Sequence, residues 1–393
     1  MGLILNDLKN ACELEHVCDY VNNRTTSSMN YISTENMLPN KGGISESTII
    51  PPGTTTEYKI GDILISNIRP YFQKIWCADR CGGCSADVLC IRAKENTDSK
   101  YLYYLLSQQA FFDYVMSGAK GCKMPRGDKK QIMQWPVNIP AIDVQKKVVA
   151  ILSSLDNKIR LNRRINDNLE EQAKALFKSW FVDFEPFKGG KFVDSELGLI
   201  PKGWSTETIY SYIDVIYGAP YKSALFNDKK QGLPLIRIRD LKTYTPQYYT
   251  KEVLPNTEYV ECGDIIAGMD AEFIPHIWRG EKGVLNQRLC KFVPKYDYVS
   301  KYYIYSLVYP KLAFVQSYKV GTTVSHLGKA DIDRFKVIVP PEDIIMQYSK
   351  IVNSYFAEIV KVSNENQILS SLRDTLLPKL MSGELSVEEV SLD

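Results

Sequence analysis

Features that would mark a membrane protein, an exported protein or a nucleotide-binding enzyme are missing from these 393 residues. No stretch of 18 or more residues is apolar and uncharged, so no transmembrane helix is expected. The first residues contain no basic start and carry an acidic residue at Asp7, which argues against a secretory signal. No Gly-x-Gly-x-x-Gly run and no Gly-x-x-x-x-Gly-Lys-Ser/Thr loop occurs, so we expect no nucleotide site.

Histidine is scarce, and the three histidines do not have the His-x-x-x-His spacing typical of a metal site. The Asn/Asp-Pro-Pro-aromatic loop of base-amino methyltransferases and a recognisable S-adenosylmethionine site are also absent. Glu57 and Lys59 form a Glu-x-Lys tripeptide like the end of a nuclease metal site, but that tripeptide is common by chance. These absences argue against a nuclease or a methyltransferase that acts alone.

The chain has no large excess of positive charge: 48 Lys and Arg residues face 46 Asp and Glu residues, so the formal net charge is only +2. A dedicated DNA-binding domain is often more basic, so a nucleic-acid role must rest on local clusters. One cluster of Lys and Arg lies within residues 120–130, and Arg160, Arg163 and Arg164 form another. The second cluster lies in a predicted helix, where it either touches DNA or forms a solvated face.

The nine cysteines, an odd number without an export signal, predict reduced thiols and a cytoplasmic protein. Cys77, Cys81, Cys84 and Cys90 fall within fourteen residues. Two thiolate pairs could hold a tetrahedral zinc ion, but this spacing does not give two Cys-x-x-Cys pairs. Cys90 also lies in an apolar run, where a thiol packs as a small hydrophobic group. We favour buried or incidental thiols, with zinc as the alternative.

An internal repeat with an offset of about 200 residues runs through the chain. Gly-Asp-Ile at 61–63 recurs at 263–265, and an Ile-Trp pair follows each copy, ending at Trp76 and Trp278. Leu89-Cys90 recurs as Leu289-Cys290, and residues 31–37 lie opposite 235–241. The segment 129–140 aligns with 329–340 without a gap. Because these matches keep the same order, we predict two copies of one module.

Short apolar runs broken by Gly, Pro and Asn predict strands of a mixed α+β domain in each copy. We expect strands at residues 60–66, 87–93, 235–241 and 336–340, and one helix in each copy, at 100–117 and 301–317.

Two longer segments keep an apolar spacing of three to four residues, from Val144 to about Phe181 and from Ile345 to Leu380. Each predicts a helix of about 35 residues, roughly 50 Å long. One apolar stripe on so long a helix needs a partner, and the obvious partner is the other long helix. Asn162 and Asn366 interrupt the stripes; they either fix the register of a coiled coil or are local variation.

This layout resembles the specificity subunit of Type I restriction-modification enzymes. The residues that carry the resemblance are 61–76 (GDILISNIRPYFQKIW), 148–187 with the ending LFKSWFVDFEPF, 197–204 (LGLIPKGW) and 371–385 (SLRDTLLPKLMSGEL). The cysteine cluster is a departure that the family does not require. The resemblance implies target recognition domains at 1–141 and 188–341, and long-helix spacers at 142–187 and 342–393. It also implies antiparallel pairing of the helices in a pseudo-two-fold circular arrangement.

The resemblance further implies a function. Each recognition domain would read one half of a bipartite, asymmetric site in double-stranded DNA, and the helices would dock two methyltransferase subunits. Restriction subunits that translocate DNA would join through those. The chain itself would not be an enzyme and would hold no cofactor, since S-adenosylmethionine, ATP and Mg²⁺ would act on the partners. Two alternatives remain: the recognition half of a self-contained restriction-modification enzyme, and a coiled-coil adaptor without a DNA role.

Candidate DNA contacts come from polar and basic loops, because cations bind phosphates and side chains at base edges give specificity. In the first copy we select Asn67, Arg69, Tyr71, Lys74, Lys120, Lys123, Arg126 and Lys129. In the second copy we select His276, Arg279, Lys319, Thr322, Thr323, Ser325 and His326.

An apolar helix end is large for a surface and should pack on the second domain or on a methyltransferase subunit. Its residues are Leu176, Phe177, Trp180, Phe181 and Phe184.

Overall fold

The computed structural model describes residues 11–26, 29–47, 53–121, 123–319 and 326–390. The chain divides into two compact units, each of which is α+β. The first unit comprises Met1–Asn157 and Ser371–Asp393, and the second comprises Lys158–Ser370. Each unit therefore contains a segment of both long helices, α4 (Ile142–Phe181) and α7 (Glu342–Ser382). The prediction of two helical segments of about this length is confirmed.

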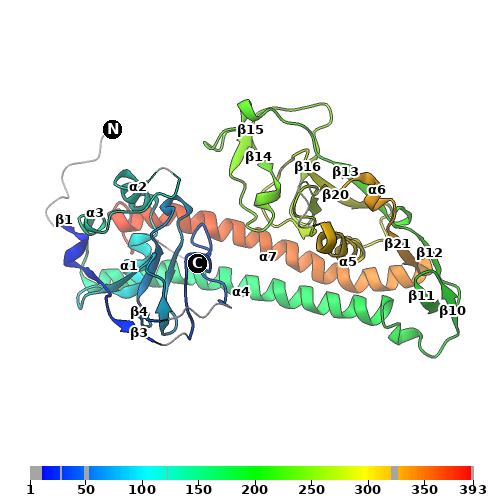
Figure 1. Ribbon diagram of the computed structural model, residues 1–393, viewed down its shortest axis with the longest axis horizontal. Coiled ribbons are helices and arrows are strands. Elements are labelled where there is room, and N and C mark those ends of the chain that lie inside the picture. Colours follow the sequence, from blue (N-terminus) through cyan, green and yellow to red (C-terminus); the bar gives the residue numbers. More distant parts are fainter. Residues whose placement is uncertain (1–10, 27–28, 48–52, 122, 320–325, 391–393) are drawn as a thin grey trace. The chain divides into compact units, whose positions relative to one another are not determined.

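The first unit contains three shorter helices and three sheets in its described part (Figure 1). The helices are α1 (Ser99–Leu106), α2 (Gln109–Ser117) and α3 (Lys129–Met133). The strands are β1 (Ala11–Glu13), β2 (Cys18–Tyr20), β3 (Arg24–Thr25), β4 (Thr55–Tyr58), β5 (Ile63–Ser66), β6 (Ile75–Cys77), β7 (Gly82–Cys84), β8 (Val88–Ala93) and β9 (Pro136–Asn138). They pair in the orders β2-β8-β5-β6, β3-β4-β7 and β1-β9.

The second unit repeats this plan with an added hairpin and a second sheet of four strands. Its shorter helices are α5 (Lys301–Lys319) and α6 (Lys329–Ile332). Its strands are β10 (Phe192–Ser195), β11 (Gly198–Pro201), β12 (Ser205–Thr208), β13 (Ile213–Tyr217), β14 (Leu233–Ile236), β15 (Tyr248–Thr250), β16 (Tyr259–Val260), β17 (Ile265–Gly268), β18 (His276–Ile277), β19 (Gly283–Leu285), β20 (Leu289–Pro294) and β21 (Lys336–Val339). The order β13-β20-β17-β18 corresponds to β2-β8-β5-β6, and β12-β21 corresponds to β1-β9. A sheet β15-β14-β19-β16 and the hairpin β10-β11 complete the unit.

The repeated Gly-Asp-Ile sequence forms the same turn before β5 and β17. Gly61 and Gly263 both have a positive φ, of 89° and 94°, which glycine adopts without steric strain. The Asp62 carboxylate accepts a hydrogen bond from the backbone N–H three residues earlier at 2.8 Å, and Asp264 does the same at 3.0 Å. Glycine and aspartate are thus retained because one permits the turn and the other closes it.

The repeated Leu-Cys dipeptide is not equivalent in the two units. Leu64 of β5 pairs with Cys90, whereas Ile266 at the same place in β17 pairs with Lys291. Cys290 therefore corresponds to Leu89, and our alignment of Cys90 with Cys290 is wrong by one residue. A shift of one residue moves a strand side chain to the opposite face of the sheet.

Each central sheet packs on two apolar clusters, one on each face. In the first unit, Ile63 and Leu89 face a cluster with α1 and α2, while Leu64 and Cys90 face a cluster with Trp76. In the second unit, Cys290 belongs to the large cluster that includes α5 residues. Both faces are buried, which explains why the runs at β5 and β17 are apolar throughout instead of alternating.

Two of the predicted elements differ in the structure. The helix expected at 100–117 is two helices, because Gln108 between α1 and α2 has an extended backbone (φ −70°, ψ 147°). The strand expected at 235–241 ends with β14, and the chain continues into a short 3₁₀ helix, Ile238–Asp240. The Asp240 carboxylate accepts a hydrogen bond from the Arg237 N–H at 3.0 Å, which stabilises this turn.

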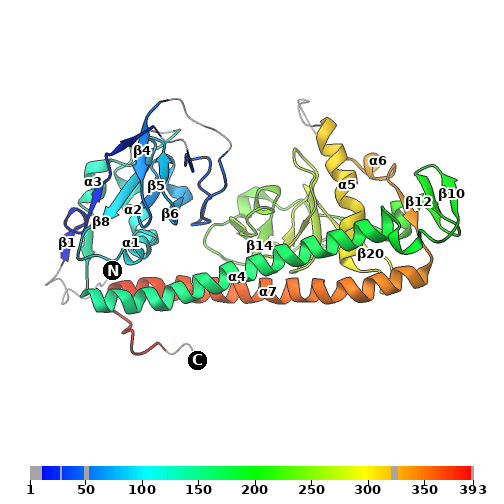
Figure 2. The ribbon, with the colours of Figure 1, turned by 90° about the horizontal axis from the view of Figure 1, so that it is seen from below.

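Within each unit the segments of α4 and α7 lie side by side and run antiparallel (Figure 2). In the first unit, Asp156 of α4 accepts a hydrogen bond from Arg373 of α7 at 2.9 Å. In the second unit, Asn162 Nδ2 donates to Asn366 Oδ1 at 3.0 Å, and Asn166 Nδ2 donates to Ser363 Oγ at 3.0 Å. The interruption in the apolar stripes is therefore a buried polar layer, of the kind that favours one register over others.

None of the helices in the described ranges combines the length and the apolar composition that crossing a bilayer requires.

Candidate nucleic-acid interface

The turn after β5 and the loop before α3, which are far apart in sequence, meet in the first unit. Ile68 forms an isolated antiparallel bridge with Arg126, and the Arg69 N–H donates to the Pro125 carbonyl at 2.8 Å. Arg126 and Lys120 exchange two backbone hydrogen bonds of 3.0 Å, so the loop closes as a small hairpin. The two segments selected from the sequence therefore form one surface.

Several of the selected side chains of this surface are exposed. Lys120 forms an ion pair with Asp128 at 3.0 Å, and Arg126 forms one with Asp87 at 3.1 Å. The Lys120 ammonium, with two backbone N–H groups, holds the pKa of Asp128 below its usual value. Lys123, Tyr71 and Lys129 are also exposed, and the Tyr20 hydroxyl donates to the Lys129 carbonyl at 3.1 Å, which anchors its backbone.

The second unit has the same crossing with different side chains. Asp270 forms an isolated antiparallel bridge with His326, and the Leu327 N–H donates to the Met269 carbonyl at 2.7 Å. His326 Nδ1 lies 2.7 Å from Asp270 Oδ1, and Lys319 Nζ donates to the His326 carbonyl at 2.8 Å. Thr322, Thr323 and Ser325, also selected from the sequence, lie outside the described residues.

Three of the selected residues make internal contacts away from these crossings. Lys74 Nζ donates to the Thr34 carbonyl at 2.7 Å, and burial lowers the pKa of Lys74. Burial also lowers the pKa of His276, although Glu272 near its ring raises it. Arg279 forms an ion pair with Glu170 of α4 and is largely buried. These contacts lie within each unit and use part of the hydrogen-bonding capacity of the three side chains.

Sequence reasoning missed three residues at the crossings: Asp87, Asp270 and Arg288. Arg288 forms an ion pair with Asp270 at 3.1 Å, as Asp87 does with Arg126. Asp87 and Arg288 each directly precede a central strand, β8 or β20. The only sequence signal for Asp87 and Arg288 is their place directly before an apolar strand. Their charges are opposite, and no short motif marks either residue.

The aromatic end of α4 is part of the core of the second unit. Phe181 and Phe184 are buried, and Leu176, Phe177 and Trp180 pack against the same cluster. The Phe181 ring lies 4.9 Å from the Tyr348 ring of α7 and 5.1 Å from the Tyr303 ring of α5, measured between centroids. These side chains join three helices of one unit.

The four clustered cysteines are divided among different surroundings. Cys77 packs against the cluster on the helical side of the sheet, and Cys84 and Cys90 are buried in the cluster on its other side. Cys81 is exposed. Burial raises the pKa of Cys77 to about 11, so it is a thiol at neutral pH. In the ranges that the structure covers, no three His, Cys, Asp or Glu side chains are grouped to hold a metal ion.

The arginine cluster of α4 is solvent-facing. Arg160, Arg163 and Arg164 are exposed on the segment of the helix that belongs to the second unit.

Comparison with known proteins identifies relatives over most of the chain. A sequence family described as "Type I restriction modification DNA specificity domain" matches twice, over residues 10–171 and 201–370. The Type I restriction enzyme MjaIX specificity subunit of Methanocaldococcus jannaschii is 28% identical over 325 residues, covering 76% of this chain and 71% of that protein. The HindI specificity subunit of Haemophilus influenzae is 24% identical over 433 residues, covering 90% and 94%.

A solved structure of the S subunit of a Type I restriction-modification system from M. genitalium aligns with 96% of this chain and 98% of its own, with a TM-score of 0.46 and 15% identity. The family resemblance noted in the sequence is confirmed by the two matches of the family, one in each half of the chain. Specificity subunits are non-catalytic and carry no cofactor of their own, so the prediction that the chain is not an enzyme is confirmed as well. The chain belongs to the family of Type I restriction-modification specificity subunits, the DNA-recognition components of those systems.

Proposed function

We propose that the chain reads a bipartite, asymmetric site in double-stranded DNA, one half-site with each unit. The observation that carries the proposal is the repeated crossing of the turn after β5 or β17 with the loop before α3 or α6. The bridges and backbone hydrogen bonds correspond at the described positions of the two crossings, while the exposed side chains differ there. Equivalent backbones with different side chains are what two related but unequal half-sites require, because base edges are distinguished by the groups presented to them.

The proposed contacts are the exposed and half-buried residues of these crossings. They are Asn67, Arg69, Tyr71, Lys120, Lys123, Arg126 and Lys129 in the first unit, and Lys319 and His326 in the second. Thr322, Thr323 and Ser325 remain candidates from the sequence. Lysines in such loops neutralise phosphates and supply affinity, while arginine and the polar side chains supply discrimination.

Selection of bound duplexes from a random pool, with the chain assembled with its cognate methyltransferase, tests this function. The expected result is a motif of two different half-sites separated by a gap of fixed length. Recovery of duplexes without a common motif would overturn the proposal and favour a scaffold without a DNA role. Methylation by the chain alone with labelled S-adenosylmethionine would instead indicate a self-contained enzyme.

The outer face of α7 in the second unit is the proposed docking surface for a methyltransferase subunit. An open groove of about 900 Å³ there is lined by Phe356, Val360, Ile368 and Leu369, among others. Ile368 is 69% exposed, unusual for a large aliphatic side chain on a helix whose other face is already paired. Restriction subunits would join through the methyltransferases, and S-adenosylmethionine, ATP and Mg²⁺ would act on those partners in the cytoplasm.

Replacing Ile368 by glutamate is expected to weaken methyltransferase binding at least tenfold, because a carboxylate in an apolar interface loses its hydration. Titration of the labelled chain with the purified methyltransferase measures the dissociation constant. Lys361→Glu is the matched control: Lys361 also lines the groove, but its side chain is 75% exposed, so the change should affect the affinity much less. Equal affinities for wild type and Ile368→Glu would contradict this docking surface.

A further inference from the structure

In both units, a residue other than glycine adopts a left-handed backbone in the turn that follows β5 or β17. Arg69 has a φ of 51° after β5, and Ala271 has a φ of 59° after β17. The two positions are equivalent, because each lies one residue beyond the bridge at Ile68 or Asp270. Backbone of this kind is unfavourable for residues with a Cβ and is concentrated at functional sites. The turn is thus a retained geometry that does not depend on which side chain it carries.

Backbone hydrogen bonds fix which residues correspond at this turn. The Asn67 N–H donates to the Asp87 carbonyl at 2.9 Å, and the Met269 N–H donates to the Arg288 carbonyl at 2.9 Å. Asp87 and Arg288 therefore occupy the same position, at the start of β8 and β20. The bridges make Arg126 equivalent to His326, and Ile68 equivalent to Asp270.

The acid and the arginine occupy different positions in the two crossings. In the first unit the strand start supplies the acid, Asp87, and the loop supplies Arg126. In the second unit the strand start supplies Arg288, and the turn supplies the acid, Asp270. Each crossing therefore presents one arginine with one carboxylate, although no single position keeps its charge.

The two arginines are held in similar ways. Arg126 Nη2 lies 3.1 Å from Asp87 Oδ1, and Arg288 Nη1 lies 3.1 Å from Asp270 Oδ2. Their side chains are 57% and 56% exposed. A guanidinium has five N–H donors, so one contact with a carboxylate leaves donors for a ligand while restricting the orientation of the group.

We propose that Arg126 and Arg288 are the base-reading arginines of the two units, each directed at a guanine of its own half-site. This inference rests on the proposed function. Paired guanidinium donors match the O6 and N7 acceptors of guanine in the major groove. Asp87 and Asp270 act as positioning residues that hold each arginine ready, and His326 shares Asp270 with Arg288.

The test compares duplexes selected by the assembled complex containing wild type, Arg126→Ala or Arg288→Ala. Wild type should show a guanine at one position in each half-site. Arg126→Ala should reduce the preference for that guanine at least about fivefold in one half-site and leave the other unchanged, and Arg288→Ala should do the reverse. Lys123→Ala, an exposed cation in the loop of Arg126, should weaken binding to all duplexes alike.

Arg126→Lys separates base reading from charge and from folding. It keeps the cation but lacks the paired donors, so it should retain affinity for non-specific duplexes and still lose the guanine preference. Unchanged half-site preferences in both alanine variants, beside a wild type that selects a bipartite motif, would overturn this inference and leave the proposed function intact. A wild-type complex that selects no motif would overturn both.

Discussion

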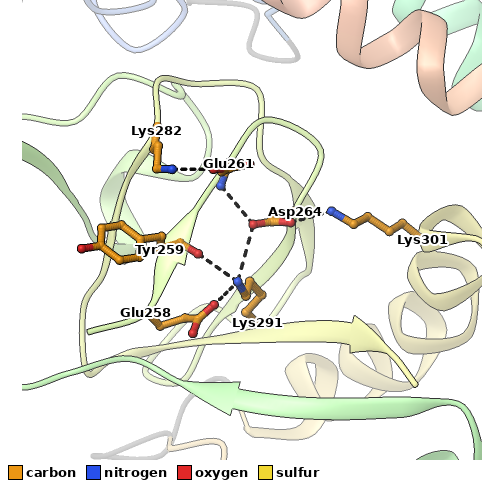
Figure 3. Close-up of polar contacts among 7 residues, drawn as sticks. All are labelled: Glu258, Tyr259, Glu261, Asp264, Lys282, Lys291 and Lys301. Carbon is orange, nitrogen blue, oxygen red and sulfur yellow. Dashed lines mark hydrogen bonds and ion pairs between the residues drawn. The ribbon is translucent and has the colours of Figure 1, made fainter. Parts of the chain in front are cut away.

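Replacing Lys291 by alanine is expected to lower the free energy of unfolding of the second unit by about 2–3 kcal/mol. Lys291 lies on β20, and its side chain is only 10% exposed. Its ammonium contacts the Glu258 carboxylate, the Tyr259 carbonyl at 2.8 Å and Asp264 Oδ2 at 3.6 Å (Figure 3). Alanine would remove this cation from Glu258, whose side chain is 27% exposed, while Asp264 would keep its ion pair with Lys301 at 2.6 Å.

Lys282, which is also drawn in Figure 3, provides the matched control because its ion pair is exposed. It forms an ion pair with Glu261 at 2.6 Å, but both side chains are more than half exposed. Lys282→Ala is therefore expected to change the free energy of unfolding by less than about 1 kcal/mol. Hydrogen exchange of the β17 and β20 amides in the native state measures both variants. Similar losses of protection in the two would show that burial of the Lys291 network contributes nothing.

Replacing Phe181 by alanine is expected to destabilise the isolated chain by about 3–5 kcal/mol. Phe181 is 6% exposed and contacts the rings of Tyr348, Tyr303 and Trp204. Its loss would leave a cavity where α4, α5 and α7 meet, and packed aromatic rings relax into such a cavity only in part. Urea unfolding of the chain without partners measures the effect.

The neighbouring Val182, which is 55% exposed, is the matched control. Val182→Ala should leave the urea midpoint nearly unchanged. If Phe181→Ala has the same midpoint as wild type and loses only methyltransferase binding, the aromatic end of α4 is a contact with that partner and not part of the core.

The long helices and the repeat could be predicted from sequence because the helices carry long periodic patterns and the repeated turn needs particular residues. An apolar stripe that keeps helical spacing over more than thirty residues is typical of a long helix with a paired face, and Gly61 and Asp62 have fixed tasks in one turn. The break between α1 and α2 could not be predicted in the same way. Residues 107 and 108 are compatible with a helix, and only the packed structure gives Gln108 its extended backbone.

Strand register and the composition of the candidate site were beyond sequence reasoning for a related reason. The offset between equivalent residues is not constant: Ile68 corresponds to Asp270, Asp87 to Arg288 and Arg126 to His326. An alignment of identical letters therefore matched Cys90 with Cys290 across opposite faces of a sheet. Because the acid and the arginine lie at different positions in the two units, the two clusters share a composition but no motif, so only contacts in space reveal them.

The left-handed turn after β5 and β17 has a consequence for how such a protein diversifies. Arg69 and Ala271 adopt nearly the same backbone, so the geometry is imposed by the hydrogen bonds around it and not by the residue itself. A side chain as large as arginine and one as small as alanine are both accommodated at that position while the turn is kept. If each unit reads one half-site, as we propose, side-chain changes on this backbone in one unit would give a new half-site and leave the other half-site unchanged.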